Sequence, residues 1–152
     1  MGVEIERKFL VDEAIWADEK PKTGVRICQG YLLKSKEKTV RIRTKTCAQY
    51  SKGFITIKGA TEGFSRLEYE YEIPFSEAEE LLAEFCPKKI IKTRYELKLN
   101  EFVWEVDEFE SPQSGLILAE IELLNEAQSF GRPKWLKKEV TGEAQYYNAN
   151  ML

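Results

Sequence analysis

The chain has 152 residues, of which 43% are hydrophobic and 32% are charged, and its formal net charge is -3 at pH 7. This length and balance are typical of a globular protein, so we expect residues 1–152 to form a single domain with a sizeable core. The weak negative charge gives no support to nucleic-acid binding, and an anionic ligand would need a local cluster of basic side chains.

The absence of targeting patterns and the spacing of the cysteines indicate the cellular compartment. No apolar run approaches the roughly 20 residues of a membrane-spanning helix, and the first ten residues do not resemble a secretory signal, so we expect a cytoplasmic protein without a membrane partner. Cys28, Cys47 and Cys86 are widely separated and odd in number, which favours free thiols. Histidine is absent, which excludes Ser-His and Cys-His catalysis and favours Mg²⁺, Mn²⁺ or Ca²⁺ for any metal site.

Short segments in which apolar and polar residues alternate dominate the chain, and this period of two predicts β-strands. In chain order, the predicted strands cover residues 3–11, 26–34, 38–46, 53–59, 65–74, 91–98, 102–109 and 117–124. Eight strands with few helices predict an α+β fold that is mainly antiparallel β. Closure into a barrel is one way to protect the sheet edges, but the pattern alone does not prove it.

Few segments have helical signals. Ser76 with Glu79 three residues later resembles a capping box, which predicts a helix that begins at Ser76 and ends before Pro87. Weaker signals predict short helices near residues 12–19 and 143–151, and Trp135 predicts a packed turn between the last strand and the tail.

The polar positions of the strands are mostly charged. Glu4, Glu6 and Lys8 share one face because side chains two residues apart on a strand point the same way. An ordinary solvent-exposed sheet face explains any one such strand. The repetition along nearly every strand favours a sheet that is curled around a charged lumen, with its apolar side outward. The charged residues that continue the pattern are Arg41, Arg43, Lys45, Lys58, Arg66, Glu68, Glu70, Glu72, Lys92, Arg94, Glu96, Glu105, Asp107, Glu120 and Glu122.

The types of charged residue indicate the kind of ligand. Guanidinium groups match the geometry of phosphate oxygens. Glu4 and Glu6, and likewise Glu120 and Glu122, are same-face pairs of carboxylates. Such like charges repel each other by about 4 kcal/mol at 4 Å and an effective dielectric constant near 20, and a divalent cation between them makes the interaction favourable. A condensed phosphate that carries Mg²⁺ suits both groups better than duplex DNA does.

The segment Glu4-Ile5-Glu6-Arg7-Lys8 resembles the Glu-x-Glu-x-Lys signature of the CYTH domains, also called triphosphate tunnel metalloenzymes. Eight further segments resemble later family motifs, in family order and over essentially the whole chain, and the likeness is greatest to small bacterial members. The resemblance implies an eight-stranded closed antiparallel barrel, or tunnel, with a few flanking helices and the active site in the lumen. The eight segments are 29–32, 40–43, 56–59, 66–70, 92–95, 104–107, 119–122 and 138–141.

The resemblance also implies roles for individual residues. Lys92, paired with Tyr31, corresponds to the lysine that is proposed to activate water in the bacterial members, and a further phosphate ligand is the alternative for Lys92. Mg²⁺ or Mn²⁺ is the implied cofactor. The implied metal ligands are Glu4, Glu6, Glu120 and Glu122, assisted by Asp107. The implied phosphate-binding residues are Lys8, Arg41, Arg43, Lys58, Arg66 and Arg94.

The function that the resemblance implies is metal-dependent hydrolysis of inorganic triphosphate to pyrophosphate and phosphate. One alternative is another triphosphate-processing activity, namely a class IV-type adenylyl cyclase, a thiamine triphosphatase or a nucleoside triphosphatase, although no residues for an adenine or thiazolium pocket stand out. Further alternatives are a non-catalytic polyphosphate-binding module and a purely structural β domain. The sequence is also compatible with a homodimer.

Three details add expectations. Arg7 interrupts the alternation and is predicted to point out of the lumen. The tail segment 145–148 lacks the basic residue that family members often carry before a Tyr-x-Asn sequence. Five aromatic side chains are predicted to pack on the outside of the sheet rather than to stack on a base. They are Tyr69, Tyr71, Phe75, Trp104 and Phe109.

Overall fold

The structure, a computed structural model, describes residues 3–152. The strands are β1 (Val3–Val11), β2 (Val25–Lys34), β3 (Lys38–Thr46), β4 (Ser51–Gly59), β5 (Ser65–Ile73), β6 (Ile90–Leu99), β7 (Phe102–Ser111), β8 (Ile117–Glu122) and β9 (Leu136–Glu139). The helical elements are α1 (Glu13–Glu19), α2 (Phe75–Phe85) and the 3₁₀ turns η1 (Ala144–Tyr146) and η2 (Asn148–Met151). Within this part of the chain, no helix is both long and apolar enough to span a membrane.

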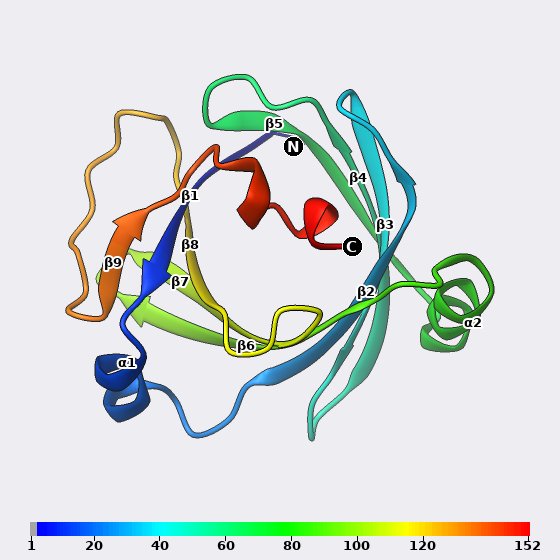
Figure 1. The fold of residues 1–152 in the computed structure, drawn as a ribbon, viewed down its shortest axis with the longest axis horizontal. Helices are drawn as coiled ribbons and strands as arrows, with labels where there is room; N and C mark the ends of the chain where they lie inside the picture. Colours follow the sequence, from blue (N-terminus) through cyan, green and yellow to red (C-terminus); the bar gives the residue numbers. More distant parts are fainter. Residues whose placement is uncertain (1–2) are drawn as a thin grey trace.

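The sheet closes into a barrel (Figure 1). The antiparallel order β5-β4-β3-β2-β6-β7-β8-β1 is completed by pairing of β1 with β5, in which Glu4 lies opposite Arg66. The expected closed eight-stranded barrel is therefore confirmed. Trp135 lies buried in a turn at residues 134–135, as expected. The turn leads into β9, a further strand that the sequence did not predict and that pairs with the far end of β1.

Two apolar clusters lie on the outside of the barrel. One contains Trp16, Trp104 and Trp135, whose rings meet edge to face at centroid distances of 5.3 Å (Trp16–Trp135) and 5.6 Å (Trp104–Trp135). It fastens α1 and the segment before β9 to the barrel. The other lies under α2, where a Cβ atom at Gly53 would come within 2.5 Å of the Ala78 Cβ. Glycine therefore permits the close approach of α2 to β4.

A third apolar cluster closes one end of the lumen. It contains Ile90, Phe109, Leu118, Val140 and Met151. Phe109 pairs with Lys92 across β6 and β7, and paired residues point to the same face of a sheet, so Phe109 points inward. The expectation that Phe109 packs on the outside is therefore wrong, whereas Trp104 does pack there.

The helix boundaries correct two further expectations. The Asp12 side chain accepts a hydrogen bond from the Ile15 N–H and caps α1, close to the predicted segment 12–19. The capping box at Ser76 is wrong, because α2 already begins at Phe75 and the Pro74 carbonyl accepts from the Glu77 and Ala78 N–H groups. The tail forms two 3₁₀ turns in place of the helix predicted over 143–151.

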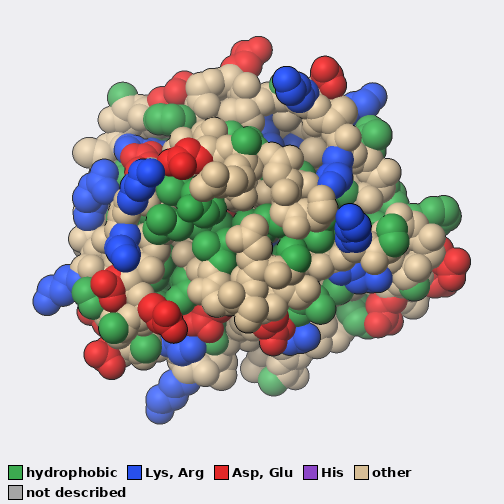
Figure 2. Space-filling view, viewed as in Figure 1, with side chains coloured by type: hydrophobic (Ala, Val, Ile, Leu, Met, Phe, Trp, Pro, Cys, Tyr) green, Lys and Arg blue, Asp and Glu red, His purple; other side chains and the backbone are tan. Residues whose placement is uncertain are grey.

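The tail lies across one mouth of the barrel, inside the ring of strands in Figure 1. Figure 2, seen from the same side, shows uncharged side chains and backbone over the centre of this face, with most charged side chains nearer its margin. The tail thus separates solvent on this side from the lumen.

Candidate active site in the barrel lumen

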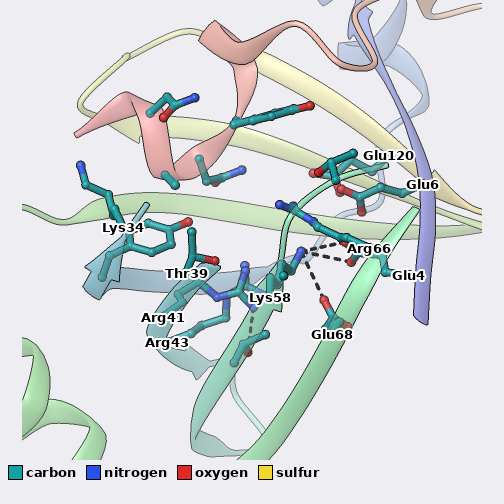
Figure 3. Close-up of a pocket in the computed structure, with 18 of the residues that line it drawn as sticks. Glu4, Glu6, Lys34, Thr39, Arg41, Arg43, Lys58, Arg66, Glu68 and Glu120 are labelled. Atoms are coloured by element: carbon teal, nitrogen blue, oxygen red, sulfur yellow. Dashed lines mark hydrogen bonds and ion pairs between the residues drawn. The ribbon is translucent and has the colours of Figure 1, made fainter. Parts of the chain in front are cut away.

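The lumen contains a cavity of about 870 Å³ whose walls are mostly charged (Figure 3). Every residue predicted for the site lines it except Asp107. The basic side chains of the wall are Lys8, Lys34, Lys36, Arg41, Arg43, Lys45, Lys58, Arg66, Lys92 and Arg94. The acidic side chains are Glu4, Glu6, Glu68, Glu70, Glu105, Glu120 and Glu122.

The inward positions of several strands are arranged in layers. Along β7 they change from the acidic Glu105 and Asp107 to the apolar Phe109, and along β8 from Glu122 and Glu120 to Leu118. Along β1 they change from Glu4 and Glu6 to Lys8 and then Leu10, and along β6 they are Arg94, Lys92 and Ile90 in the same direction. Glu4, Glu6, Glu105 and Glu122 therefore lie toward the mouth away from the apolar plug. The basic groups Lys8, Lys92 and Arg94 lie in the middle of the lumen, with Asp107 and Glu120 among them.

Asp107 organises the centre of this basic layer. Its Oδ1 and Oδ2 atoms accept from Arg94 Nε at 2.7 Å and Arg94 Nη2 at 2.9 Å, and Lys92 Nζ lies 2.6 Å from Oδ2. Burial outweighs this carboxylate and, together with the charges of Arg94 and Arg43, lowers the pKa of Lys92 to about 7. Burial works against ionisation of Asp107, but Arg94 and then Lys92 hold its pKa well below the ordinary value. Asp107 is 2% exposed, and both of its oxygens are engaged by cations.

Arg41 and Arg43 provide donors that protein groups only partly use. Arg41 Nη2 donates to Thr56 Oγ1 at 3.1 Å, whereas Arg41 Nε is buried and has no hydrogen-bond partner among the described residues. Arg43 Nε donates to Gln29 Oε1 at 2.8 Å. Burial, and then the charge of Arg41, lowers the pKa of Arg43 to about 9. An anion between these groups would satisfy the free donor and relieve the repulsion.

The carboxylates form two close pairs. Burial and then Glu120 raise the pKa of Glu6 well above its ordinary value, while Lys8 and a hydrogen bond with Glu6 overcome burial and lower the pKa of Glu120. Glu4 is hydrogen-bonded to Glu68 in the same way. Burial opposes ionisation of Glu4, but Lys58, followed by this hydrogen bond, lowers its pKa to about 2.

These pairs suit a divalent cation. Within residues 3–152, no group of three or more potential ligands is already arranged around one point. Glu6 and Glu120 nevertheless lie close enough for each to change the pKa of the other, and hard divalent cations prefer carboxylate oxygens. A cation between them would remove the repulsion. The donor chemistry therefore fits Mg²⁺ or Mn²⁺.

Three basic residues connect the carboxylates to the rest of the wall. Lys58 Nζ donates to both Glu4 oxygens at 2.9 and 3.1 Å and lies 3.2 Å from Glu68 Oε2. Arg66 Nε donates to Glu4 Oε1 at 3.3 Å. Lys8 Nζ donates to the Tyr146 carbonyl at 2.9 Å and lies 3.7 Å from Glu120 Oε1. Lys58 thus joins Glu4 on β1 to Glu68 on β5, as the dashed lines in Figure 3 show.

The tail supplies groups that the sequence did not assign. The Tyr147 ring centroid lies 5.6 Å from Lys8 Nζ and 5.9 Å from Arg66 Cζ. Asn148 Oδ1 accepts from Lys92 Nζ at 3.0 Å and from Gln29 Nε2 at 3.3 Å. The expected partner Tyr31 lines the cavity but makes no hydrogen bond with Lys92 in the described chain, and on β2 it pairs with Arg41.

Sequence reasoning did not select Glu68, Gln29 or Asn148 for the site. Glu68 belongs to the alternating pattern, but its link with Glu4 depends on barrel closure through β5. Gln29 opens one of the matched motifs, and Asn148 lies in the noted tail segment. For both, the available signal was a polar residue within a motif, which does not say what the side chain contacts.

Residues 2–150 match the family model of the CYTH domain. The motifs, the closed barrel and this match agree, and the chain belongs to the CYTH domain family.

Named relatives cover nearly the whole chain. The inorganic triphosphatase of Acetivibrio thermocellus is 45% identical, and the alignment covers 100% of this chain and 94% of that protein. The inorganic triphosphatase of Nitrosomonas europaea is 38% identical over 95% of this chain and 93% of its own. A crystal structure of an inorganic triphosphatase has a TM-score of 0.64 and 33% identity, covering 99% of this chain and 94% of the other.

Proposed function

We propose that the protein is a divalent-metal-dependent triphosphatase that cleaves inorganic triphosphate into pyrophosphate and phosphate inside the lumen. The observation that carries this proposal is the group of three buried guanidinium groups, Arg41, Arg43 and Arg94, in one cavity with paired carboxylates. A buried donor without a partner, such as Arg41 Nε, costs about 1–3 kcal/mol, so the lumen favours an anion. The names of the two similar proteins support the same reaction.

The residues divide the work of hydrolysis. Arg41, Arg43 and Arg94 bind phosphate oxygens and neutralise the charge that develops during in-line attack on phosphorus. Lys92, in its neutral form, accepts a proton from the attacking water. As the water oxygen bonds to the terminal phosphorus, the bridging P–O bond breaks, and pyrophosphate leaves with that electron pair while the terminal group becomes phosphate.

The carboxylate pairs complete the site. Glu4, Glu6, Glu120 and Glu122 would hold a divalent cation, Mg²⁺ or Mn²⁺, and we assign Asp107 to positioning Arg94 and Lys92. When bound, the cation supplies further charge neutralisation at the phosphate oxygens.

The cavity favours an inorganic substrate over a nucleotide. Among the described residues its aromatic lining is limited to Tyr31 and Tyr147. The Tyr147 ring is next to Lys8 and Arg66. A nucleobase would gain little stacking here.

A substrate panel tests the proposal. Purified protein is incubated with tripolyphosphate, ATP or pyrophosphate, each with Mg²⁺, Mn²⁺ or chelator, and released phosphate and cyclic AMP are measured. We expect rapid metal-dependent release from tripolyphosphate, slow release from ATP and none from pyrophosphate. Formation of cyclic AMP would instead support the cyclase alternative, and tight polyphosphate binding without release would support a binding module.

A further inference from the structure

A buried chain of hydrogen bonds joins the tail to two residues of the basic layer. Gln29 is 0% exposed, and its Oε1 atom accepts from Arg43 Nε at 2.8 Å. Its Nε2 atom donates to Asn148 Oδ1 at 3.3 Å, and the same oxygen accepts from Lys92 Nζ at 3.0 Å. The side-chain amides of Gln29 on β2 and Asn148 on the tail therefore connect Arg43, a candidate phosphate ligand, with Lys92, the candidate base.

The amine of Lys92 needs such partners because a lysine side chain is flexible along its four-carbon stem. It is fully buried and has two oxygen acceptors, Asp107 Oδ2 at 2.6 Å and Asn148 Oδ1 at 3.0 Å. A neutral amine has two N–H groups and one lone pair. If both N–H groups donate to these two acceptors, the lone pair is left to face the cavity.

Gln29 has a different role at the other end of this chain of hydrogen bonds. By accepting from Arg43 Nε, it fixes the plane of the guanidinium group and leaves the terminal nitrogens for a ligand. By donating to Asn148 Oδ1, it also holds that oxygen toward Lys92. Neither amide adds a charge that would compete with the substrate.

We propose that Asn148 and Gln29 are positioning residues of the triphosphatase site: Asn148 aims the Lys92 amine at the attacking water, and Gln29 orients Arg43 for the phosphate. This inference rests on the proposed function and extends it to the tail. Asn148 contacts Lys92 directly, whereas Gln29 contacts Arg43 directly and reaches Lys92 only through Asn148, so loss of Asn148 should mainly lower kcat and loss of Gln29 should mainly weaken binding.

The test compares three near-isosteric variants, Asn148→Leu, Asn148→Asp and Gln29→Met, with the wild-type protein. Initial rates with tripolyphosphate give kcat and KM, calorimetry gives the affinity for tripolyphosphate with the metal omitted, and thermal melting verifies folding. Gln145→Ala is the matched control, because Gln145 is an exposed tail residue outside the cavity wall.

We expect Asn148→Leu to lower kcat by about tenfold or more while KM and affinity stay within about threefold, because a misdirected base slows chemistry more than binding. Asn148→Asp keeps an acceptor oxygen but adds a negative charge that raises the pKa of Lys92, so its kcat is expected to approach the wild-type value only at higher pH. Gln29→Met is expected to raise KM and weaken binding by about tenfold, the size of one lost charge-assisted contact. Gln145→Ala is expected to match the wild type.

Two results would overturn the positioning roles in an active wild-type enzyme. One is a kcat within twofold of the wild type in Asn148→Leu. The other is a parallel loss of kcat, affinity and melting temperature in both Asn148 variants, which would show that Asn148 only holds the tail in place. A wild-type protein that releases no phosphate from tripolyphosphate would overturn the proposed function and this inference together.

Discussion

At the scale of single residues, the chemistry of the lumen depends on how burial is balanced by neighbouring charges. Lys92 and Arg94 both contact Asp107, yet burial lowers the pKa of Lys92 to about 7, whereas Asp107 and then Glu105 outweigh burial and raise the pKa of Arg94. Arg94 is doubly hydrogen-bonded to Asp107, so it stays a permanent cation. One carboxylate thus contacts a fixed positive charge, Arg94, and a lysine whose pKa is lowered because burial outweighs that carboxylate.

The lowered pKa of Lys92 predicts the pH dependence of the reaction. Lys92 must be neutral to act as a base, so kcat/KM should rise with pH, reach half of its plateau near pH 7 and level off above that pH. A lysine at its ordinary value would give a rise that continues toward pH 10. The measurement is kcat/KM for tripolyphosphate between pH 5 and 10 in the presence of saturating metal.

Two variants separate Lys92 from other titrating groups. Lys92→Arg keeps the positive charge but cannot act as a base, so its residual activity should lack the rise near pH 7. Lys137→Ala removes an exposed cation outside the cavity and should keep the wild-type profile. A rise that persists in Lys92→Arg would assign the titration to another group and leave Lys92 as a phosphate ligand.

Glu6 gives a prediction about metal binding that does not depend on turnover. Burial and Glu120 raise the pKa of Glu6, so this carboxyl group tends to be protonated in the absence of metal. The neutral glutamine of Glu6→Gln resembles that protonated form. In the wild type, metal at a hundredfold excess over its dissociation constant should stabilise the fold by about 2.7 kcal/mol. We expect thermal melting to show this gain in the wild type and to lose it in Glu6→Gln.

The control for this prediction is Glu79→Gln, which removes an exposed carboxylate on α2. It should keep the full metal-induced gain. An undiminished gain in Glu6→Gln would place the metal away from the Glu6–Glu120 pair.

At the scale of elements, sequence periodicity predicted strands better than it predicted their connections. Segments 3–11 and 38–46 coincide with β1 and β3, because alternation between an apolar outer face and a charged inner face is a strong signal. β9 has four residues, too few for such a pattern. The tail turns are held by contacts with the barrel, such as the one from Lys8 to the Tyr146 carbonyl, which local sequence does not reveal.

The attachment of β9 illustrates what an outward charge does. Arg7 points out of the lumen, as predicted, and its Nε atom donates to Glu139 Oε2 at 2.8 Å. Its guanidinium also lies 5.1 Å from the Phe130 ring centroid. The side chain that interrupts the alternation of β1 therefore fastens β9 to the barrel.

Glu139→Gln should destabilise the fold by about 1 kcal/mol, near the upper end for ion pairs at a protein surface, because the contact is bidentate and partly buried. Urea unfolding measures this change. Glu143→Gln is the matched control, because its partner Lys138 is 72% exposed and 3.7 Å away, and it should have almost no effect. Equal effects of the two variants would contradict the role of Arg7.

The same pair has a defined pH dependence. The hydrogen bond from Arg7 lowers the pKa of Glu139 below its ordinary 4.5, so the folded state binds this proton less tightly than the unfolded state does. The stabilisation is therefore complete above about pH 4.5 and is lost as pH falls through the folded value. The difference in stability between wild type and Glu139→Gln should shrink below pH 4.5.

At the scale of the whole molecule, the site exists because the sheet closes into a barrel through the pairing of β1 with β5. Most lumen residues could be predicted from the alternating charges and the family motifs. Their partners could not, because the pairing of Glu4 with Arg66 and the contact of Lys92 with Asn148 join parts of the chain more than 50 residues apart. Only the closed barrel brings the acidic layer, the basic layer and the tail around one cavity.

The measurement that tests this account most directly is phosphorus NMR of tripolyphosphate during incubation with the protein and Mg²⁺. The account predicts that the tripolyphosphate signals are replaced by pyrophosphate and phosphate in equal amounts, that pyrophosphate then persists, and that chelator stops the reaction. An unchanged tripolyphosphate spectrum with either Mg²⁺ or Mn²⁺, or an equal rate with chelator, would contradict it.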